Sequence, residues 1–82
     1  MTSRFEVDPG APEYVYVQVA NHIADRIGSG DLPVKGRLPG ERDLAEEYGV
    51  SFGTMRKATE LLRERGLITT LHGKGSYIVK KP

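Results

Sequence analysis

The chain has 82 residues with a formal net charge of +1, and its 38% apolar and 28% charged residues fit one small globular domain and exclude a disordered chain. It contains no cysteine, and its two histidines lie far apart without carboxylates at ligand spacing, so we expect no disulfide, metal site or cofactor. No apolar run approaches the ~20 residues of a membrane span, and the N-terminus lacks the apolar segment of a signal peptide, which predicts a cytoplasmic protein without membrane contacts.

The chain begins with an arm, and its first helix follows. Residues 1–12 contain two prolines and a glycine without an apolar period, so we assign them to an N-terminal arm and residues 13–80 to the folded domain. A helical pattern starts at Glu13, and Gly28 and Gly30 are expected to end it. The apolar residues at helical spacing are Tyr16, Val19, Ala20, Ile23 and Ile27. The opposite, polar side carries Asn21, Asp25 and Arg26.

Two shorter helices are predicted after a loop at residues 31–40. The second helix spans Glu41 to Tyr48, with acidic residues in its first turn and Gly49 just past its end. A three-residue turn, Gly49-Val50-Ser51, leads into a third helix that runs to about Arg65. Ser51 offers an N-cap hydroxyl for this helix. The residues expected to face inward are Leu44, Ala45 and Tyr48 in the second helix and Met55, Ala58, Leu61 and Leu62 in the third.

The C-terminal part of the chain changes to a strand pattern. Residues 67–71 and 76–79 are rich in β-branched and aromatic side chains, and the glycine-rich residues 72–75 between them predict a β-hairpin. The fold class is therefore mainly α with a small β-hairpin, a winged helix-turn-helix of three helices plus a two-stranded wing. Residues 1–55 carry five basic and nine acidic side chains, whereas residues 56–82 carry seven and two. This asymmetry favours an anion-binding side, although a solvated helix face would also account for it.

The predicted third helix and hairpin supply groups that suit DNA. In a helix-turn-helix the second helix of the pair enters the major groove with its N-terminal end. Its exposed positions are expected to be Phe52, Gly53, Thr54, Arg56 and Lys57. Arg42, at the start of the preceding helix, could bind a phosphate or pair with Glu46. In the hairpin loop, Lys74 could contact phosphate, while Gly73 and His72 could equally be ordinary turn residues.

Five short motifs occur in order along this region. They are Leu-Pro-x-Glu-Arg-x-Leu-Ala from Leu38, Gly-Val-Ser from Gly49, Thr-x-Arg-x-Ala from Thr54, Gly-Leu-Ile from Gly66 and Gly-x-Gly from Gly73. Together they resemble the N-terminal winged helix-turn-helix domain of the GntR family of bacterial transcription regulators. The resemblance implies that the glutamate–arginine pair, the recognition helix and the wing contact DNA. The DNA-binding residues so expected are Arg42, Ser51, Phe52, Gly53, Thr54, Arg56, Lys57, His72, Gly73 and Lys74.

Three positions depart from the family pattern. Gly40 replaces the serine that usually precedes the glutamate–arginine pair, which removes a hydroxyl cap worth about 0.5–2 kcal/mol. Phe52 replaces an arginine that reads guanine, and an aromatic ring can contact a thymine methyl group instead. Gly53 weakens the helix start by about 1 kcal/mol relative to alanine. The family's usual operator preference therefore does not transfer to this chain.

The hypotheses for function belong to three classes. The first is sequence-specific binding of a double-stranded DNA operator by a homodimer that represses transcription, with the third helix in the major groove and the wing in the minor groove. The second is a winged-helix protein–protein adaptor. In an adaptor the face of the third helix would be buried against the partner and would not carry charged side chains. An enzyme is not expected, because no catalytic set of residues is present. Family members usually continue into an effector-binding domain, and no small-molecule effector site is visible in this sequence.

Overall fold

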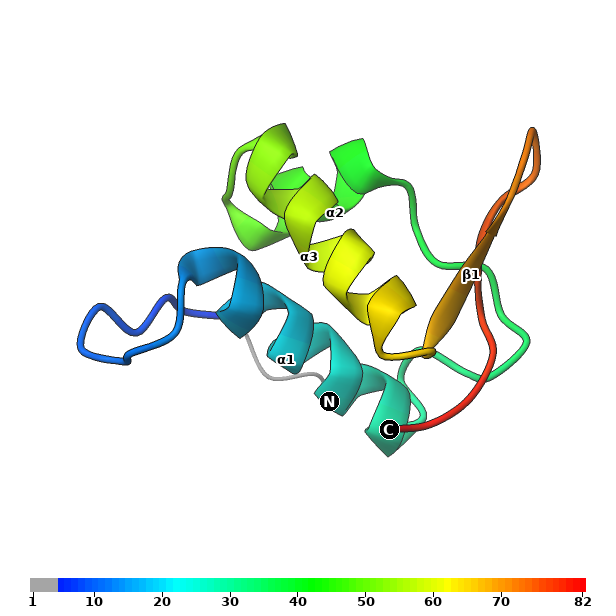
Figure 1. The fold of residues 1–82 in the computed structure, drawn as a ribbon, viewed down its shortest axis with the longest axis horizontal. Helices are drawn as coiled ribbons and strands as arrows, with labels where there is room; N and C mark the ends of the chain where they lie inside the picture. The colour runs from blue at the N-terminus through cyan, green and yellow to red at the C-terminus, as the bar shows by residue number, and fades with distance from the viewer. Residues whose placement is uncertain (1–4) are drawn as a thin grey trace.

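The computed structural model describes residues 5–82, which form three helices followed by a two-stranded antiparallel sheet (Figure 1). The elements are α1 (Val15–Ser29), α2 (Glu41–Tyr48), α3 (Phe52–Glu64), β1 (Ile68–Leu71) and β2 (Gly75–Ile78). Helix α3 packs against α1, α2 and β1 and forms the centre of the domain. The predicted architecture of three helices plus a two-stranded wing is confirmed. Among the helices described, none has the length and apolarity needed to cross a membrane.

Helix α1 differs from its predicted bounds at both ends. It begins after Glu13, and Gly28 lies inside the helix instead of ending it. The helix ends at Ser29, and the backbone N–H of its C-cap residue Gly30 donates to the carbonyl of Ile27. A glycine within a helix costs only about 1 kcal/mol relative to alanine, so the apolar stripe that continues to Ile27 carries the helix past Gly28. The rest of the predicted stripe is buried except Tyr16, which is half-buried.

The described part of the predicted arm, residues 5–12, lies against α1. The side-chain oxygen of Gln18 accepts from the backbone N–H of Asp8 at 2.8 Å, and its Nε2 donates back to the Asp8 carbonyl at 3.1 Å. The ring of Phe5 packs edge-on against that of His22, with 5.5 Å between centroids. The boundary between arm and domain stays a prediction, and the four residues before Phe5 lie outside the described part of the chain.

Helices α2 and α3 are joined by a turn that requires a glycine. Gly49 has a φ of 66°, in the left-handed region that glycine adopts without a Cβ penalty. The N–H of Val50 then donates to the carbonyl of Ala45 at 3.1 Å and closes the end of α2. At the other end of α2, Gly40 is the N-cap and makes no side-chain cap bond. The helix-turn-helix predicted around Gly49 is confirmed.

The apolar core lies between the three helices and the inner face of the wing. Its largest fully buried apolar side chains are Val19, Ile23, Ile27, Leu44, Met55, Leu62 and Ile78. One polar residue of α3, Thr59, is only 1% exposed and was not predicted to face inward. Its hydroxyl group donates to the carboxylate of Glu41 and lies 3.0 Å from the carbonyl of Arg56, so the buried polar group has partners. Leu61, expected to face inward, is half-buried.

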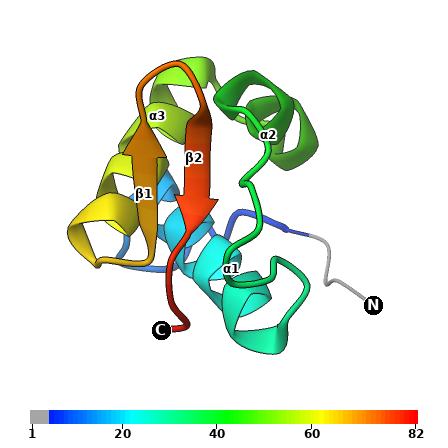
Figure 2. The same cartoon turned by 90° about the vertical axis from the view of Figure 1, so that its right-hand side faces the viewer.

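The wing contains more pairing than the sequence predicts. Strands β1 and β2 pair from Ile68 and Ile78 at the base to Leu71 and Gly75 at the tip, so Gly75 belongs to β2 and not to the loop. The predicted loop 31–40 also runs beside β2 (Figure 2). Arg37 and Tyr77 form a single antiparallel bridge there. This pairing joins segments distant in the chain, and for that reason local sequence patterns do not reveal it.

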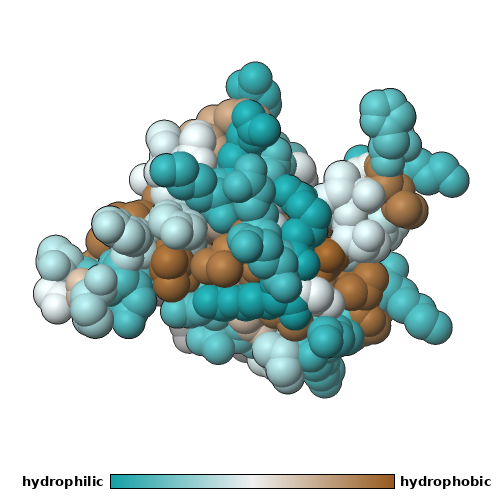
Figure 3. All heavy atoms as spheres, in the orientation of Figure 1, coloured by the Kyte–Doolittle hydropathy of each residue, from teal (hydrophilic) through white to brown (hydrophobic). Residues whose placement is uncertain are grey.

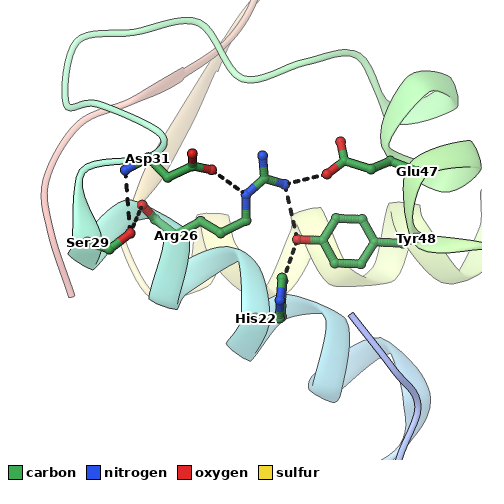
Figure 4. A network of polar contacts seen from close by, with 6 residues as sticks. All are labelled: His22, Arg26, Ser29, Asp31, Glu47 and Tyr48. Carbon is green, nitrogen blue, oxygen red and sulfur yellow. Dashed lines mark hydrogen bonds and ion pairs between the residues drawn. The ribbon is translucent and has the colours of Figure 1, made fainter. Parts of the chain in front are cut away.

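Arg26 of α1 is held by groups from two other parts of the domain, the loop after α1 and helix α2 (Figure 4). Its Nε donates to Asp31 and its Nη1 to Glu47, both at 2.8 Å, and Nη1 also lies 3.3 Å from the Tyr48 hydroxyl. That hydroxyl is 2.8 Å from Nδ1 of His22. Burial raises the pKa of Tyr48 above its ordinary value, because the charged phenolate is poorly solvated there. Arg26 therefore joins α1 to α2, and the expectation that it simply lies on the polar side of α1 is wrong.

Candidate nucleic-acid interface

Ser51 fixes the first turn of α3. Its Oγ accepts from the backbone N–H of Thr54 at 3.1 Å and donates to the Thr54 hydroxyl at 2.9 Å. The predicted N-cap is therefore confirmed. Thr54 is half-buried rather than exposed as predicted, whereas Phe52 and Gly53 are exposed. The end of α3 that would enter a groove is thus held by its own side-chain contacts.

Replacing Ser51 by alanine should lower the free energy of unfolding by about 0.5–2 kcal/mol, because the N–H of Thr54 loses its acceptor. Urea unfolding followed by circular dichroism measures this loss. Ser51→Thr keeps a hydroxyl acceptor at the same position and should retain most of the stability. An equal loss in both variants would mean that the hydroxyl acceptor is not the source of the lost stability.

Arg42 and Phe52 stack at the junction of α2 and α3. The guanidinium carbon of Arg42 lies 5.1 Å from the centroid of the Phe52 ring. Within residues 5–82, Arg42 makes no ion pair with Glu46, so the alternative pairing considered from the sequence is not formed. A cation over an aromatic face is attracted by about 0.5–1 kcal/mol at exposed sites. The stack holds the Arg42 charge beside the first turn of α3.

Arg56 and Lys57 lie on the exposed side of α3. Both side chains are exposed, while their neighbours Met55 and Ala58 point into the core. The Lys57 ammonium lies 5.9 Å from the ring centroid of Tyr16, so this side chain extends toward the start of α1. Arg56 is exposed in the second turn of α3 and has no such ring contact within the described residues.

The tip of the wing is the loop of His72, Gly73 and Lys74. All three residues are exposed. The N–H of Lys74 donates to the carbonyl of Leu71 at 2.9 Å and closes the turn. In both ribbon views the wing tip lies at the same end of the molecule as the start of α3 (Figures 1 and 2). One side of the domain thus presents both groups of predicted residues.

The structure adds one cation to this side of the molecule. Arg37 belongs to the segment paired with β2, and its guanidinium lies against Gly75 at the tip end of the wing. The sequence placed it in a plain loop, because the pairing partner is far along the chain. Within the described residues, no three histidine, aspartate or glutamate side chains are grouped to hold a metal ion.

A tight turn between two helices, a capped third helix and a β-hairpin wing define a winged helix-turn-helix domain. The family model of the bacterial regulatory proteins of the gntR family matches residues 15–78. The chain therefore belongs to the GntR family, as its motifs predict.

Several curated relatives are named as transcriptional regulators. The chain is 38% identical over 64 residues to the HTH-type transcriptional regulator SmoD of Agrobacterium fabrum, covering 78% of this chain and 27% of that protein. It is 32% identical over 74 residues to the HTH-type transcriptional repressor NagR of Bacillus subtilis, covering 90% of this chain and 30% of that protein. The chain thus spans less than a third of the length of these relatives.

Solved structures share the fold over most of the chain. YtrA from Sulfolobus acidocaldarius, a GntR-family transcription factor, aligns with a TM-score of 0.82 at 28% identity, covering 98% of this chain and 84% of that one. The DNA-binding domain of AraR in complex with its operator ORX1 aligns with a TM-score of 0.76 at 29% identity, covering 94% and 99%.

Proposed function

We propose that this chain binds double-stranded DNA in a sequence-specific manner and regulates transcription. Helix α3 would enter the major groove and the wing tip the minor groove. The residues proposed to contact DNA, or to shape the contacting turns, are Arg42, Ser51, Phe52, Gly53, Thr54, Arg56, Lys57, His72, Gly73 and Lys74. An operator site is the expected partner, and a bacterial regulator of this kind acts in the cytoplasm, where the chromosome lies.

The observation that carries this proposal is the chemistry of the exposed face of α3. Hydrophilic side chains are prominent over α3 and at the tip of the wing in the space-filling view (Figure 3), beside the exposed apolar side chains of Phe52 and Leu71. Arg56 is exposed on this helix, and the exposed Arg42 lies against Phe52 in its first turn. Guanidinium groups are common partners of phosphates and guanine edges. A protein-docking face would instead be expected to have an apolar centre depleted of charges.

Repression by a dimer is the regulatory mode that we propose. One relative is named a repressor, and the AraR domain of similar fold is in complex with an operator. A single module of this size reads few base pairs, and two copies on an inverted repeat would supply the missing affinity and specificity. A bound dimer over a promoter would then block transcription.

Selection from a pool of random DNA duplexes, with salt titration of the selected site, tests the proposal. We expect enrichment of an inverted repeat, whose symmetry gives the dimer and whose spacing gives the distance between half-sites. Affinity should fall steeply with salt, because phosphate contacts release counterions. No enrichment together with salt-insensitive binding would overturn DNA binding and favour a protein–protein adaptor.

A matched pair of double variants tests whether binding depends on the proposed face or only on the net charge of the protein. Arg42→Gln with Arg56→Gln removes two positive charges from the proposed face, and Arg65→Gln with Lys81→Gln removes two elsewhere. The first variant should lose enrichment and the second should keep it. Equal losses would show that net charge, and not this face, drives the binding.

A further inference from the structure

The wing includes a third segment that carries an arginine. The N–H of Lys35 donates to the carbonyl of Ile78 at 2.7 Å, and the N–H of Leu38 donates to that of Ser76 at 2.8 Å. Arg37, between them, pairs with Tyr77. The backbone of Arg37 is therefore fixed to β2 and moves with the wing.

The side chain of Arg37 lies over Gly75, where no other side chain occupies the space. A Cβ atom added to Gly75 would lie 2.9 Å from Nε and 3.0 Å from Nη2 of Arg37, closer than real Cβ contacts allow. Gly75 also has a φ of 104°, which other residues rarely adopt. The glycine thus leaves the space in which the guanidinium lies, directly after Lys74 of the wing tip.

The guanidinium has no acidic partner to neutralise it. Arg37 is exposed, and within residues 5–82 it forms neither an ion pair nor a side-chain hydrogen bond. An arginine presents five N–H donors. The segment that carries it runs from beside β2 up to the start of α2, where Arg42 lies (Figure 2). Along this segment and the wing, Arg37 therefore lies between Lys74 of the wing tip and Arg42 of α2.

We propose that Arg37 is a phosphate contact of the wing, in addition to the residues at its tip. This inference rests on the proposed function, because it needs the wing to lie on DNA. A guanidinium binds phosphate through a planar pair of donors, and Arg37 presents its guanidinium at the tip end of the wing. The contact would position the wing on the sugar–phosphate backbone of DNA and would not discriminate between base sequences.

The test compares the salt dependence of binding of wild-type protein and Arg37→Gln to the selected inverted-repeat duplex and to a random-sequence duplex of equal length. One lost phosphate contact should reduce the slope of log affinity against log salt by about 0.9 on both duplexes. Raising the salt concentration from about 50 to 200 mM weakens the binding of both proteins. The factor by which binding weakens should be about 3.5-fold smaller for the variant than for wild type. The ratio of affinities for the two duplexes should not change.

Two further variants make the result specific to this position. Arg37→Lys keeps the charge and should restore most of the slope. Lys35→Gln removes a charge from the base of the same segment and should leave the slope unchanged. If wild type binds DNA, any one of three results overturns the inference. These are an unchanged slope in Arg37→Gln, an equal reduction of the slope in Lys35→Gln, and a changed ratio of the affinities of Arg37→Gln for the two duplexes. A wild-type protein that does not bind DNA overturns the proposed function as well.

Discussion

Replacing Leu62 by alanine should lower the free energy of unfolding by about 2–5 kcal/mol. Leu62 is completely buried in α3, the helix that contacts α1, α2 and β1. Truncation leaves a cavity where these elements meet, and the loss is large against the roughly 5–15 kcal/mol that stabilises a typical domain. Urea unfolding followed by circular dichroism measures the change, and DNA binding at 37 °C should fall with the folded fraction.

Glu60 supplies the control for this prediction. It lies on the same helix, two residues earlier, and its side chain is exposed. Glu60→Ala should change the free energy of unfolding by no more than about 0.5 kcal/mol, as is usual for surface positions. If Leu62→Ala cost no more than Glu60→Ala, the packing of α3 against its neighbours would not determine the stability of this domain.

Replacing Arg56 by alanine should weaken binding to the selected site by about 1–3 kcal/mol, which is about 5- to 150-fold. Arg56 is exposed on the second turn of α3. A guanidinium that binds a guanine edge with two hydrogen bonds discriminates against other bases. Titration of the selected site and of variants with one changed base pair should show relaxed specificity at one position.

The effect of Arg56→Ala on binding to random DNA distinguishes a base contact from a phosphate contact. If it reads a base, binding to random duplexes should weaken far less than binding to the selected site. An equal loss on both would make Arg56 a phosphate contact and contradict the prediction. Arg65→Ala removes the same charge from the other end of α3 and should leave specificity unchanged.

Much of the candidate interface could be predicted because it depends on local rules. The N-cap of α3 follows from a serine directly before a helical pattern, and the turn follows from a glycine three residues before Phe52. The exposure of Arg56 and Lys57 follows from the helical period. Thr54 is the exception, since its bond to Ser51 draws it partly out of solvent.

Other features depend on contacts between distant segments. No spacing rule could show that Arg42 rests on Phe52, that Arg26 joins α1 to α2, or that Arg37 pairs with β2. Each of these contacts links residues that lie on different elements. They became visible only when the packing of the helices and the wing brought those elements together.

The sequence by itself therefore determined the winged helix-turn-helix and the face of α3 that we expect to meet DNA. These follow from apolar periodicity, glycine positions and capping, which act within a few residues. The tertiary structure shows which residues lie against the side chains of Arg42 and Arg37. Phe52 supports Arg42, and the space left at Gly75 places Arg37 beside the wing tip. The physical reason is that a side chain's direction is set by what packs against it, and local sequence does not contain its distant neighbours.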